Sequence, residues 1–216
     1  MRPTILCAGL IALALSGCVE NKGLSMSDFT PAMRWDHRDE APEWTARTLV
    51  AVAEEDEKLS MLVPADIKTW CPGYIDASLP QRRAFWAGLL SALSKHESTW
   101  NPRASGGGGR WIGLTQIAPA TARQYGCDAR SAAALKDGAE NLACAVEIMA
   151  DNVAADGLVA GGGNRGLGRD WAPFRKAAKR ADMAAWVSQQ SYCQVDTIKT
   201  RARGAGQTVL VSSERG

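Results

Sequence analysis

The sequence predicts a single, mainly helical domain. Apolar residues recur at three- and four-residue spacing in several long segments, which is the pattern of helices that bury one face. No segment shows the sustained alternation of apolar and polar residues that marks a half-buried strand, and no internal repeat is visible. We expect this domain to span residues 42–198, a length that suffices for one hydrophobic core.

The first 17 residues have the features of a lipoprotein signal peptide. Arg2 supplies the positive charge, residues 5–15 form an apolar stretch too short to span a bilayer, and Leu15-Ser16-Gly17-Cys18 resembles the bacterial lipobox. We therefore expect acyl chains on Cys18 that anchor the protein to a membrane. Val19 is not Asp, which favours the outer membrane, facing the periplasm. An ordinary secretory signal is the alternative.

The segments that flank the domain differ from it in composition. Residues 18–41 mix Asn, Ser, Pro and charges of both signs with little apolar periodicity, so we expect a tether. Residues 199–216 are expected to form a flexible C-terminal tail. Without residues 1–17 the chain carries 24 Lys and Arg against 23 Asp and Glu, and this near-neutral balance argues against nucleic acid as a partner.

Two helices are expected in the first half of the domain. Apolar residues from Trp44 to Leu62 recur at helical spacing, and Pro64 and Pro72 break the pattern after them. An amphipathic helix over 79–95 follows, with Ser78 as its cap.

Asn101-Pro102 ends this helix, because the residue before a proline avoids helical geometry. After the glycine run 106–109 we expect a short extended segment over 110–114. The remaining elements are helices at about 119–126, 131–136, 139–155 and 181–191, with a flexible loop at 161–168.

Glu97 is the candidate catalytic residue. It closes the helix that begins at 79, and the next thirty residues, 98–127, contain no Asp or Glu. Apolar neighbours disfavour ionisation, so this carboxyl group is expected to hold a proton near neutral pH; the flanking apolar residues are Trp86, Leu89, Leu93 and Trp100. A protonated carboxyl group is what a leaving glycosidic oxygen needs. A solvated glutamate at a helix end is the alternative.

Several linked motifs carry a family resemblance. In order they are Ser94-Lys95-His96-Glu97-Ser98-Thr99-Trp100-Asn101-Pro102, the glycine run, Gly113-Leu114-Thr115-Gln116-Ile117-Ala118-Pro119-Ala120-Thr121-Ala122, and the segment that begins at Asn141. Over about residues 80–155 the chain resembles the lytic transglycosylases of the soluble-lytic-transglycosylase (SLT) type. The resemblance implies a lysozyme-like α+β fold with a substrate cleft, peptidoglycan glycan strands as the substrate, and no cofactor.

The chain departs from the family pattern in three places. Thr115 stands where the family usually has Met, and the glycine run is longer than usual. The family's later Ala-Tyr-Asn-Ala-Gly motif is missing, and residues 168–174 stand in its place. The residue that assists Glu97 from the far side of the cleft therefore stays open.

The resemblance also implies a reaction. Lytic transglycosylases, a class of carbon–oxygen lyases, cleave the MurNAc-GlcNAc β-1,4 bond and leave a 1,6-anhydro-MurNAc end, with Glu97 in the place of the acid and base. Ser98 and Gln116 are candidate hydrogen-bonding partners of the N-acetyl groups or of the cleft backbone, and capping is their alternative role. Trp171 is a candidate sugar-stacking platform or a core residue. Trp111 is expected at the rim or in packing.

Two other functions fit the same motifs. One is a lysozyme-type hydrolase in which Asp170 positions a water molecule, although an ion pair with the adjacent Arg169 would explain Asp170 as well. The other is a non-catalytic lipoprotein that holds peptidoglycan through the cleft.

The cysteines indicate two disulfides and no metal site. Apart from Cys7 in the signal and Cys18, four cysteines remain, an even set in an exported chain. We favour Cys127 with Cys144, which bracket a compact turn between helices, and Cys71 with Cys193. His37 and His96 are the only histidines and neither has metal-ligand spacing; His96 is expected to be a packed helix residue rather than a catalytic base.

Overall fold

The computed structural model describes residues 30–194. The expected signal peptide, the expected lipidation site at Cys18 and the expected tail from residue 199 lie outside these residues. Within the described part, no helix combines the length and the apolar character that a membrane crossing requires.

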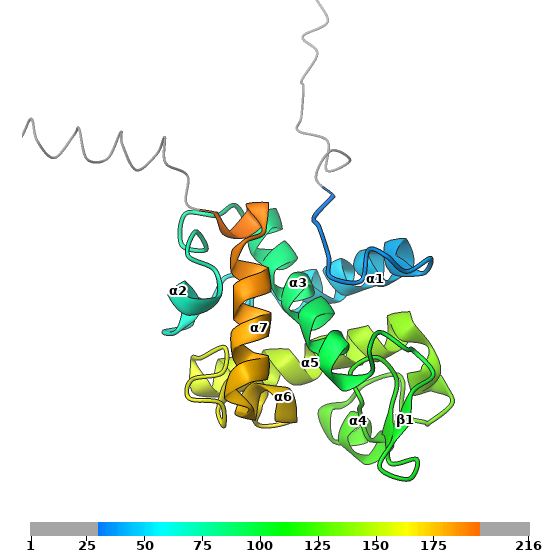
Figure 1. Ribbon diagram of the computed structural model, residues 1–216. Coiled ribbons are helices and arrows are strands. Elements are labelled where there is room, and N and C mark those ends of the chain that lie inside the picture. Colours follow the sequence, from blue (N-terminus) through cyan, green and yellow to red (C-terminus); the bar gives the residue numbers. More distant parts are fainter. Residues whose placement is uncertain (1–29, 195–216) are drawn as a thin grey trace, which may run out of the picture. The chain divides into compact units, whose positions relative to one another are not determined.

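Helix α3 (Leu79–Glu97) forms the centre of the domain (Figure 1). It packs against α1 (Ala41–Glu54) and against α7 (Ala177–Ser188), and α1 also packs along α5 (Gly138–Asp156). Every residue from Ala84 to Ser94 is buried, so the expectation of an amphipathic helix is wrong. The small residues on its polar side are covered by neighbouring helices, and the side chains of Ser91 and Ser94 bond to carbonyl oxygens within the helix itself.

A small lobe follows α3. Strand β1 (Ser105–Gly106) pairs antiparallel with β2 (Trp111–Ile112) across the glycine run. The extended segment expected at 110–114 contains β2, whereas its partner before the glycines was not foreseen. Helix α4 (Pro119–Tyr125) ends at Gly126, whose φ of 83° suits glycine. A 3₁₀ turn, η2 (Ala134–Lys136), leads into α5.

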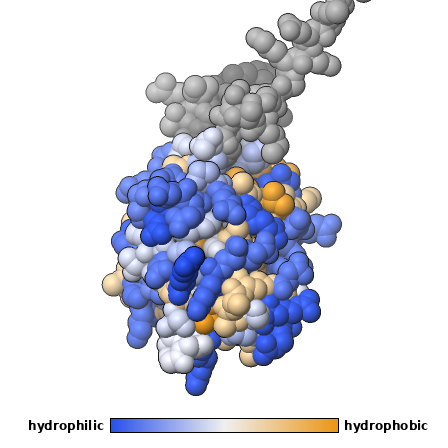
Figure 2. Space-filling model, turned by 90° about the vertical axis from the view of Figure 1, so that its right-hand side faces the viewer, coloured by the Kyte–Doolittle hydropathy of each residue, from blue (hydrophilic) through white to orange (hydrophobic). Residues whose placement is uncertain are grey.

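The remaining elements are short. They are α2 (Ile67–Trp70), η3 (Gly166–Gly168), α6 (Ala172–Arg175) and η4 (Ser191–Cys193). The first helix ends at Glu54 and not near residue 62, and the last long helix begins at Ala177 and not near 181. The expected mainly helical class is confirmed, and the face in Figure 2 is mostly hydrophilic with scattered apolar residues.

The packed domain begins earlier than the sequence indicates. Residues 31–40 were assigned to the tether, yet Met33 and Trp35 are buried in the core. Arg34 forms a bidentate ion pair with Asp182 of α7, with nitrogen–oxygen distances of 2.6 and 3.0 Å. The hydroxyl of Tyr192 donates to the carbonyl oxygen of Ala32. This segment is therefore held against α7 and η4.

Both disulfides are present in the expected pairing. Cys71 bonds to Cys193 across 122 residues, and Cys127 bonds to Cys144 across 17 residues. The first joins the loop after α2 to η4, and the second joins the end of α4 to α5.

Candidate active site

Glu97 is the last residue of α3 and is half-buried. Burial raises the pKa of its carboxyl group to about 7, although the nearby Lys179 and Arg175 act in the opposite direction. No hydrogen bond to this carboxyl group is found among residues 30–194. The group can therefore exist as an acid or as a base near neutral pH.

The chain reverses sharply after Glu97. Thr99 and Trp100 have φ angles of 54° and 55°, a left-handed conformation that side chains other than glycine seldom adopt. The indole nitrogen of Trp100 donates to the carbonyl oxygen of Ser91 at 2.9 Å and fixes the reversal against α3. Such backbone strain concentrates at functional sites, and the sequence carries no sign of it at these two residues.

Ser98 connects the end of α3 to the turn that follows β2. Its hydroxyl lies 2.8 Å from the carbonyl oxygen of Leu114 and 3.3 Å from that of Ser94, and it donates toward them. The one hydroxyl proton is used in this connection, so the structure favours the positioning role over a contact with an N-acetyl group.

Asn141 of α5 holds this turn in place. Its side-chain oxygen accepts from the backbone nitrogen of Thr115 at 2.9 Å and from the Thr115 hydroxyl at 2.7 Å. Its side-chain nitrogen donates to the carbonyl oxygens of Ile112 and Leu135, both at 3.0 Å. Thr115, which departs from the family's Met, thus supplies a buried hydrogen bond. Gly113 has a φ of 82°, and a Cβ there would lie 2.3 Å from Asn141.

Gln116 has a φ of 53° and donates from its side chain to the carbonyl oxygen of Gly113 at 3.0 Å. It borders a hollow of about 50 Å³, whose lining residues are Trp111, Gln116, Ile117, Ala118, Thr121, Ile148, Asp170 and Trp171. The structure thus brings together Gln116, Asp170 and Trp171, three residues proposed from distant segments. Glu97 does not line this hollow. The adjacent Ser98 bonds to Leu114, which is two residues before Gln116 in the turn that borders the hollow.

The two tryptophans at the hollow differ in exposure. Trp171 is 3% exposed and its indole nitrogen donates to the carbonyl oxygen of Thr115 at 2.9 Å, so it is a core residue and not a stacking platform. Trp111 is 44% exposed, and the guanidinium of Arg110 lies 5.6 Å from its ring centroid. Of these two rings, that of Trp111 is the exposed one, and the sequence analysis gave this residue a lesser role.

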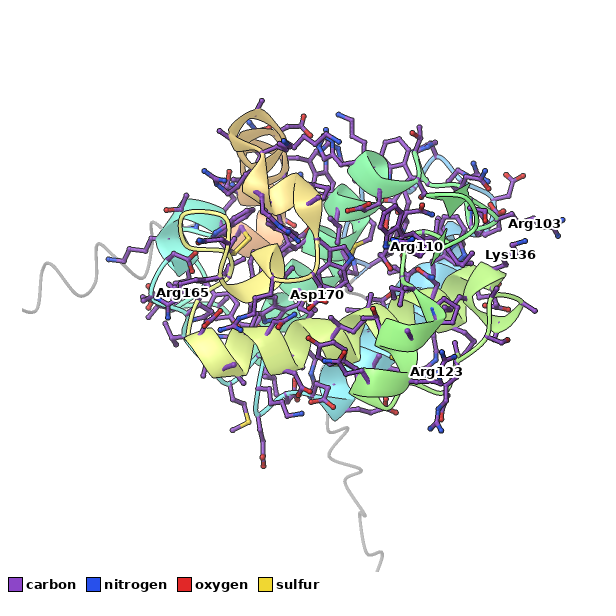
Figure 3. The ribbon with its side chains drawn as sticks, turned by 90° about the horizontal axis from the view of Figure 1, so that it is seen from below. Arg103, Arg110, Arg123, Lys136, Arg165 and Asp170 are labelled. Carbon is purple, nitrogen blue, oxygen red and sulfur yellow. A yellow bond between two sulfur atoms is a disulfide. The ribbon has the colours of Figure 1, made fainter. Side chains whose placement is uncertain are left out.

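Asp170 lies beside α5, with Arg110 further toward the small lobe (Figure 3). One of its oxygens accepts from the hydroxyl of Tyr125 at 2.9 Å and from the side-chain nitrogen of Asn152 at 2.6 Å. Burial, followed by the bond to Asp170, raises the pKa of Tyr125 to about 12, so this donor keeps its proton. Arg169 pairs instead with Asp156, and the expected alternative of an Arg169–Asp170 pair is wrong.

His96, the residue before Glu97, belongs to a cluster of charged side chains around Asp182 of α7. Its ring nitrogen lies 2.7 Å from Asp182, which also binds Arg34 and Lys95. Burial lowers the pKa of His96 despite this carboxylate. The arrangement agrees with a packed helix residue.

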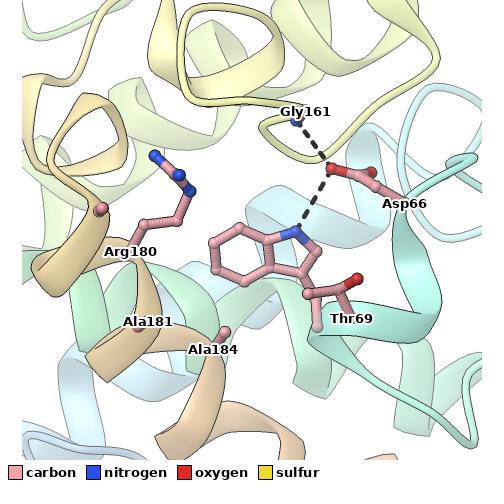
Figure 4. A pocket seen from close by; sticks show the side chains of 8 residues that line it. Asp66, Thr69, Gly161, Arg180, Ala181 and Ala184 are labelled. Atoms are coloured by element: carbon pink, nitrogen blue, oxygen red, sulfur yellow. Dashed lines mark hydrogen bonds between the residues drawn. The ribbon is translucent and has the colours of Figure 1, made fainter.

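A second hollow, of about 240 Å³, lies between α2 and α7 and is lined by none of the candidate site residues (Figure 4). At its edge Asp66 accepts from the backbone nitrogens of Val159, Ala160 and Gly161, at 2.7 to 3.0 Å. Asp66 thereby fixes the start of the loop that leads to Asp170.

A half-buried acid at the end of a central helix, beside a small β lobe, is an arrangement suited to cleaving glycans. The SLT transglycosylase domain model matches residues 77–185, and the chain belongs to this family. The comparison with curated proteins gives no match.

Solved structures of DslA share the fold. The wild-type form aligns with a TM-score of 0.68 at 27% identity, over 76% of this chain and 98% of that chain. Two mutants of DslA with a glutamate replaced by glutamine give TM-scores of 0.67 and 0.66 at 27% and 26% identity, over 74% and 75% of this chain and 95% and 97% of theirs. The fold is that of a lysozyme-like SLT domain, and the family supports peptidoglycan as substrate and a peptidoglycan-cleaving transglycosylase activity.

Proposed function

We propose that the protein is a peptidoglycan lytic transglycosylase that cleaves the MurNAc-GlcNAc β-1,4 bond and forms 1,6-anhydro-MurNAc, with Glu97 as both acid and base. The observation that carries this proposal is the half-buried Glu97 carboxyl group with its pKa of about 7, inside the segment that matches the family. One group with such a pKa can donate a proton and later accept one at the same pH.

The reaction has two steps. Glu97 first protonates the leaving oxygen of GlcNAc while the acetamido oxygen of MurNAc attacks its own anomeric carbon, so the glycosidic bond breaks as a ring closes. The Glu97 carboxylate then removes the proton of the C6 hydroxyl, whose oxygen attacks the anomeric carbon and displaces the acetamido oxygen. The 1,6-anhydro ring forms and Glu97 is protonated again. No water molecule is consumed.

One observation favours a second candidate, a lysozyme-type hydrolase. Asp170 borders the hollow and forms no ion pair with Arg169, and its hydrogen-bond donors among the described residues are the neutral groups of Tyr125 and Asn152. A carboxylate held in this way can orient a water molecule.

Mass spectrometry of muropeptides released from purified sacculi distinguishes the two reactions. We expect 1,6-anhydro ends from the wild type. Glu97→Gln should lower turnover by ~10²–10⁴-fold or more while sacculus binding persists, and Asp170→Asn should have a much smaller effect. Reducing ends, with equal losses from both substitutions, would assign the hydrolase. A wild-type protein that binds sacculi without releasing any fragment would assign the non-catalytic binding role.

We also propose that acyl chains on Cys18 attach the enzyme to the outer membrane, on the periplasmic side. The lipobox sequence Leu15-Ser16-Gly17-Cys18 supports this localisation.

A further inference from the structure

Three exposed cations lie close together at the end of α6 and the start of α7: Arg175, Lys176 and Lys179. None of them forms an ion pair with a carboxylate within residues 30–194. Of the neighbouring cations, Arg169 binds Asp156 and Lys95 binds Asp182, whereas Arg180 donates to the carbonyl oxygen of Phe174. The three positive charges are therefore left for solvent or for a ligand.

Two of these cations contact the segments that carry Glu97 and Asp170. The Lys179 ammonium lies 3.4 Å from the carbonyl oxygen of His96, the residue before Glu97. The Arg175 guanidinium lies 3.0 Å from the carbonyl oxygen of Arg169, the residue before Asp170. Their charges reach the Glu97 carboxyl group, because both lower its pKa. The flank of the candidate site formed by α6 and α7 is thus cationic.

The substrate carries negative charge in a particular place. In a peptide-bearing strand the sugars are neutral, because the lactyl carboxyl group of MurNAc forms the amide to the peptide, whereas the stem peptide has free carboxylates. That peptide is linked to C3 of MurNAc, and the bond that breaks in the proposed function is at C1 of the same sugar. The stem peptide therefore begins within one sugar ring of the atom that Glu97 acts on.

We propose that Arg175 and Lys179 form a subsite for the carboxylates of the stem peptide, so that the enzyme selects peptide-bearing glycan over denuded glycan. This inference rests on the proposed function, because it uses the position of the scissile bond. Exposed ion pairs contribute little individually, so we expect a preference of about 2- to 5-fold from each cation and about tenfold from the two together at low ionic strength.

The test compares kcat/KM on two substrates: soluble glycan strands that carry stem peptides, and the same strands after an amidase has removed the peptides and the lactyl carboxylates that this exposes have been converted to neutral amides. The wild type should prefer the peptide-bearing strands by about tenfold, and Arg175→Gln with Lys179→Gln should bring the ratio close to one. The ratio is informative because any change in the pKa of Glu97 affects both substrates equally. Lys179→Arg, which keeps the charge, should retain most of the preference.

A matched control is Arg123→Gln. Arg123 is an exposed arginine of α4 that lies at the far edge of the small lobe, away from Asp170 (Figure 3). It should leave the ratio unchanged, and about 0.5 M salt should lower the ratio of the wild type but not that of the double variant. A wild-type ratio near one, or a double variant that keeps the wild-type ratio, would overturn the proposal.

A binding measurement separates this inference from the proposed function. The Glu97→Gln protein can be sedimented with untreated sacculi or with sacculi whose peptide carboxylates have been converted to neutral amides, so no turnover is needed. Stronger retention on the untreated sacculi, lost when Arg175→Gln and Lys179→Gln are added, supports the subsite even if the products prove to be reducing ends. Equal retention on both kinds of sacculi contradicts it.

Discussion

At the scale of single residues, the chemistry depends on opposing influences on Glu97. Burial raises the pKa of this carboxyl group, and the cations Lys179 and Arg175 limit the rise, so the result lies close to neutral pH. A deeper site without these cations would hold the proton too firmly for the carboxylate to act as a base at neutral pH. An exposed site would release the proton too readily for it to act as an acid.

The pH dependence of kcat/KM should follow this pKa. The acid step needs protonated Glu97, so kcat/KM should fall about tenfold per pH unit above pH ~7. Lys179→Gln removes a charge that lowers the pKa, and the falling limb should move to higher pH. Rates on soluble glycan strands between pH 5 and 9 would show this; a limb that moves to lower pH contradicts the assignment of Glu97 as the acid.

The Glu97 carboxyl group should lower the free energy of unfolding at high pH. Its pKa in the folded protein is above the ordinary value of 4.5, so its contribution to stability is fully present below pH ~4.5 and is lost as the pH rises through ~7. Since one pKa unit corresponds to ~1.4 kcal/mol, Glu97→Gln should be more stable than the wild type by on the order of 3 kcal/mol at pH 8. Urea unfolding of both proteins at pH 4 and pH 8 tests this, and a gap that does not widen between the two pH values refutes it.

The sequence predicted some features of the candidate site and not others. The raised pKa expected for Glu97 is present, because burial has the effect that its apolar sequence neighbours indicated. For Ser98 and Trp171 the sequence left a substrate contact and a structural role open, and the structure favours the structural role, because they bond to the backbone of Leu114 and Thr115. Those partners are 16 and 56 residues away, so spacing along one helix gives no sign of them. Tyr125, which holds Asp170 from 45 residues away, was missed for the same reason.

At the scale of elements, the turn beside Glu97 is held by a single amide. Asn141→Ala would remove the partner that Asn141 supplies to the carbonyl oxygen of Leu135 and to the backbone nitrogen of Thr115 in a buried place. The carbonyl oxygen of Ile112 would keep its bond from the backbone nitrogen of Ile117. We expect a loss of about 3 kcal/mol, against about 1 kcal/mol for Thr115→Val, which removes only the hydroxyl. Chemical unfolding of the two variants measures the difference; similar losses would show that Asn141 does not organise the turn.

Long helices were predictable, and short ones were not. The positions of α4 and α5 follow from Pro119, Gly126 and the apolar periodicity after residue 138. Helices α2 and α6 have four residues each, too few for a periodic pattern. Their places depend on tertiary bonds, such as those from Asp66 to the loop at 159–161.

At the scale of the whole molecule, the two disulfides should differ in their contribution to stability. In the loop-entropy model, the bond across 17 residues contributes about 3 kcal/mol and the bond across 122 residues about 5 kcal/mol. Replacing both Cys71 and Cys193 by Ala should therefore destabilise the protein more than replacing Cys127 and Cys144. Urea unfolding tests the order, and the reverse order would mean that native-state contacts outweigh loop entropy.

Membrane attachment is a separate prediction. Cys18→Ala removes the residue that the lipobox would acylate, so the protein should leave the membrane fraction while its domain remains active on sacculi. Fractionation of cells expressing each form is the measurement. A Cys18→Ala protein that is still processed and still sediments with membranes excludes the anchor.

The start of the domain could not be located from the sequence. Met33 and Trp35 are isolated among polar residues and show no periodicity, yet both are buried. Trp35 packs against Trp44 of α1. The segment is also tied to parts far along the chain, through bonds of Arg34 to Ser91 of α3 and Asp182 of α7 and a bond from Tyr192 of η4 to Ala32. Composition alone indicated a tether there.

The bonds that hold residues 31–35 against the domain also limit the distance between the enzyme and a membrane anchor. Because this segment is fixed to the domain, only the 13 residues 18–30 are left to separate the domain from an anchor at Cys18. Fully extended, they span at most about 45 Å. An enzyme attached in this way can work only on the layer of cell wall nearest its membrane, and lengthening the tether should widen that zone without any change in the site.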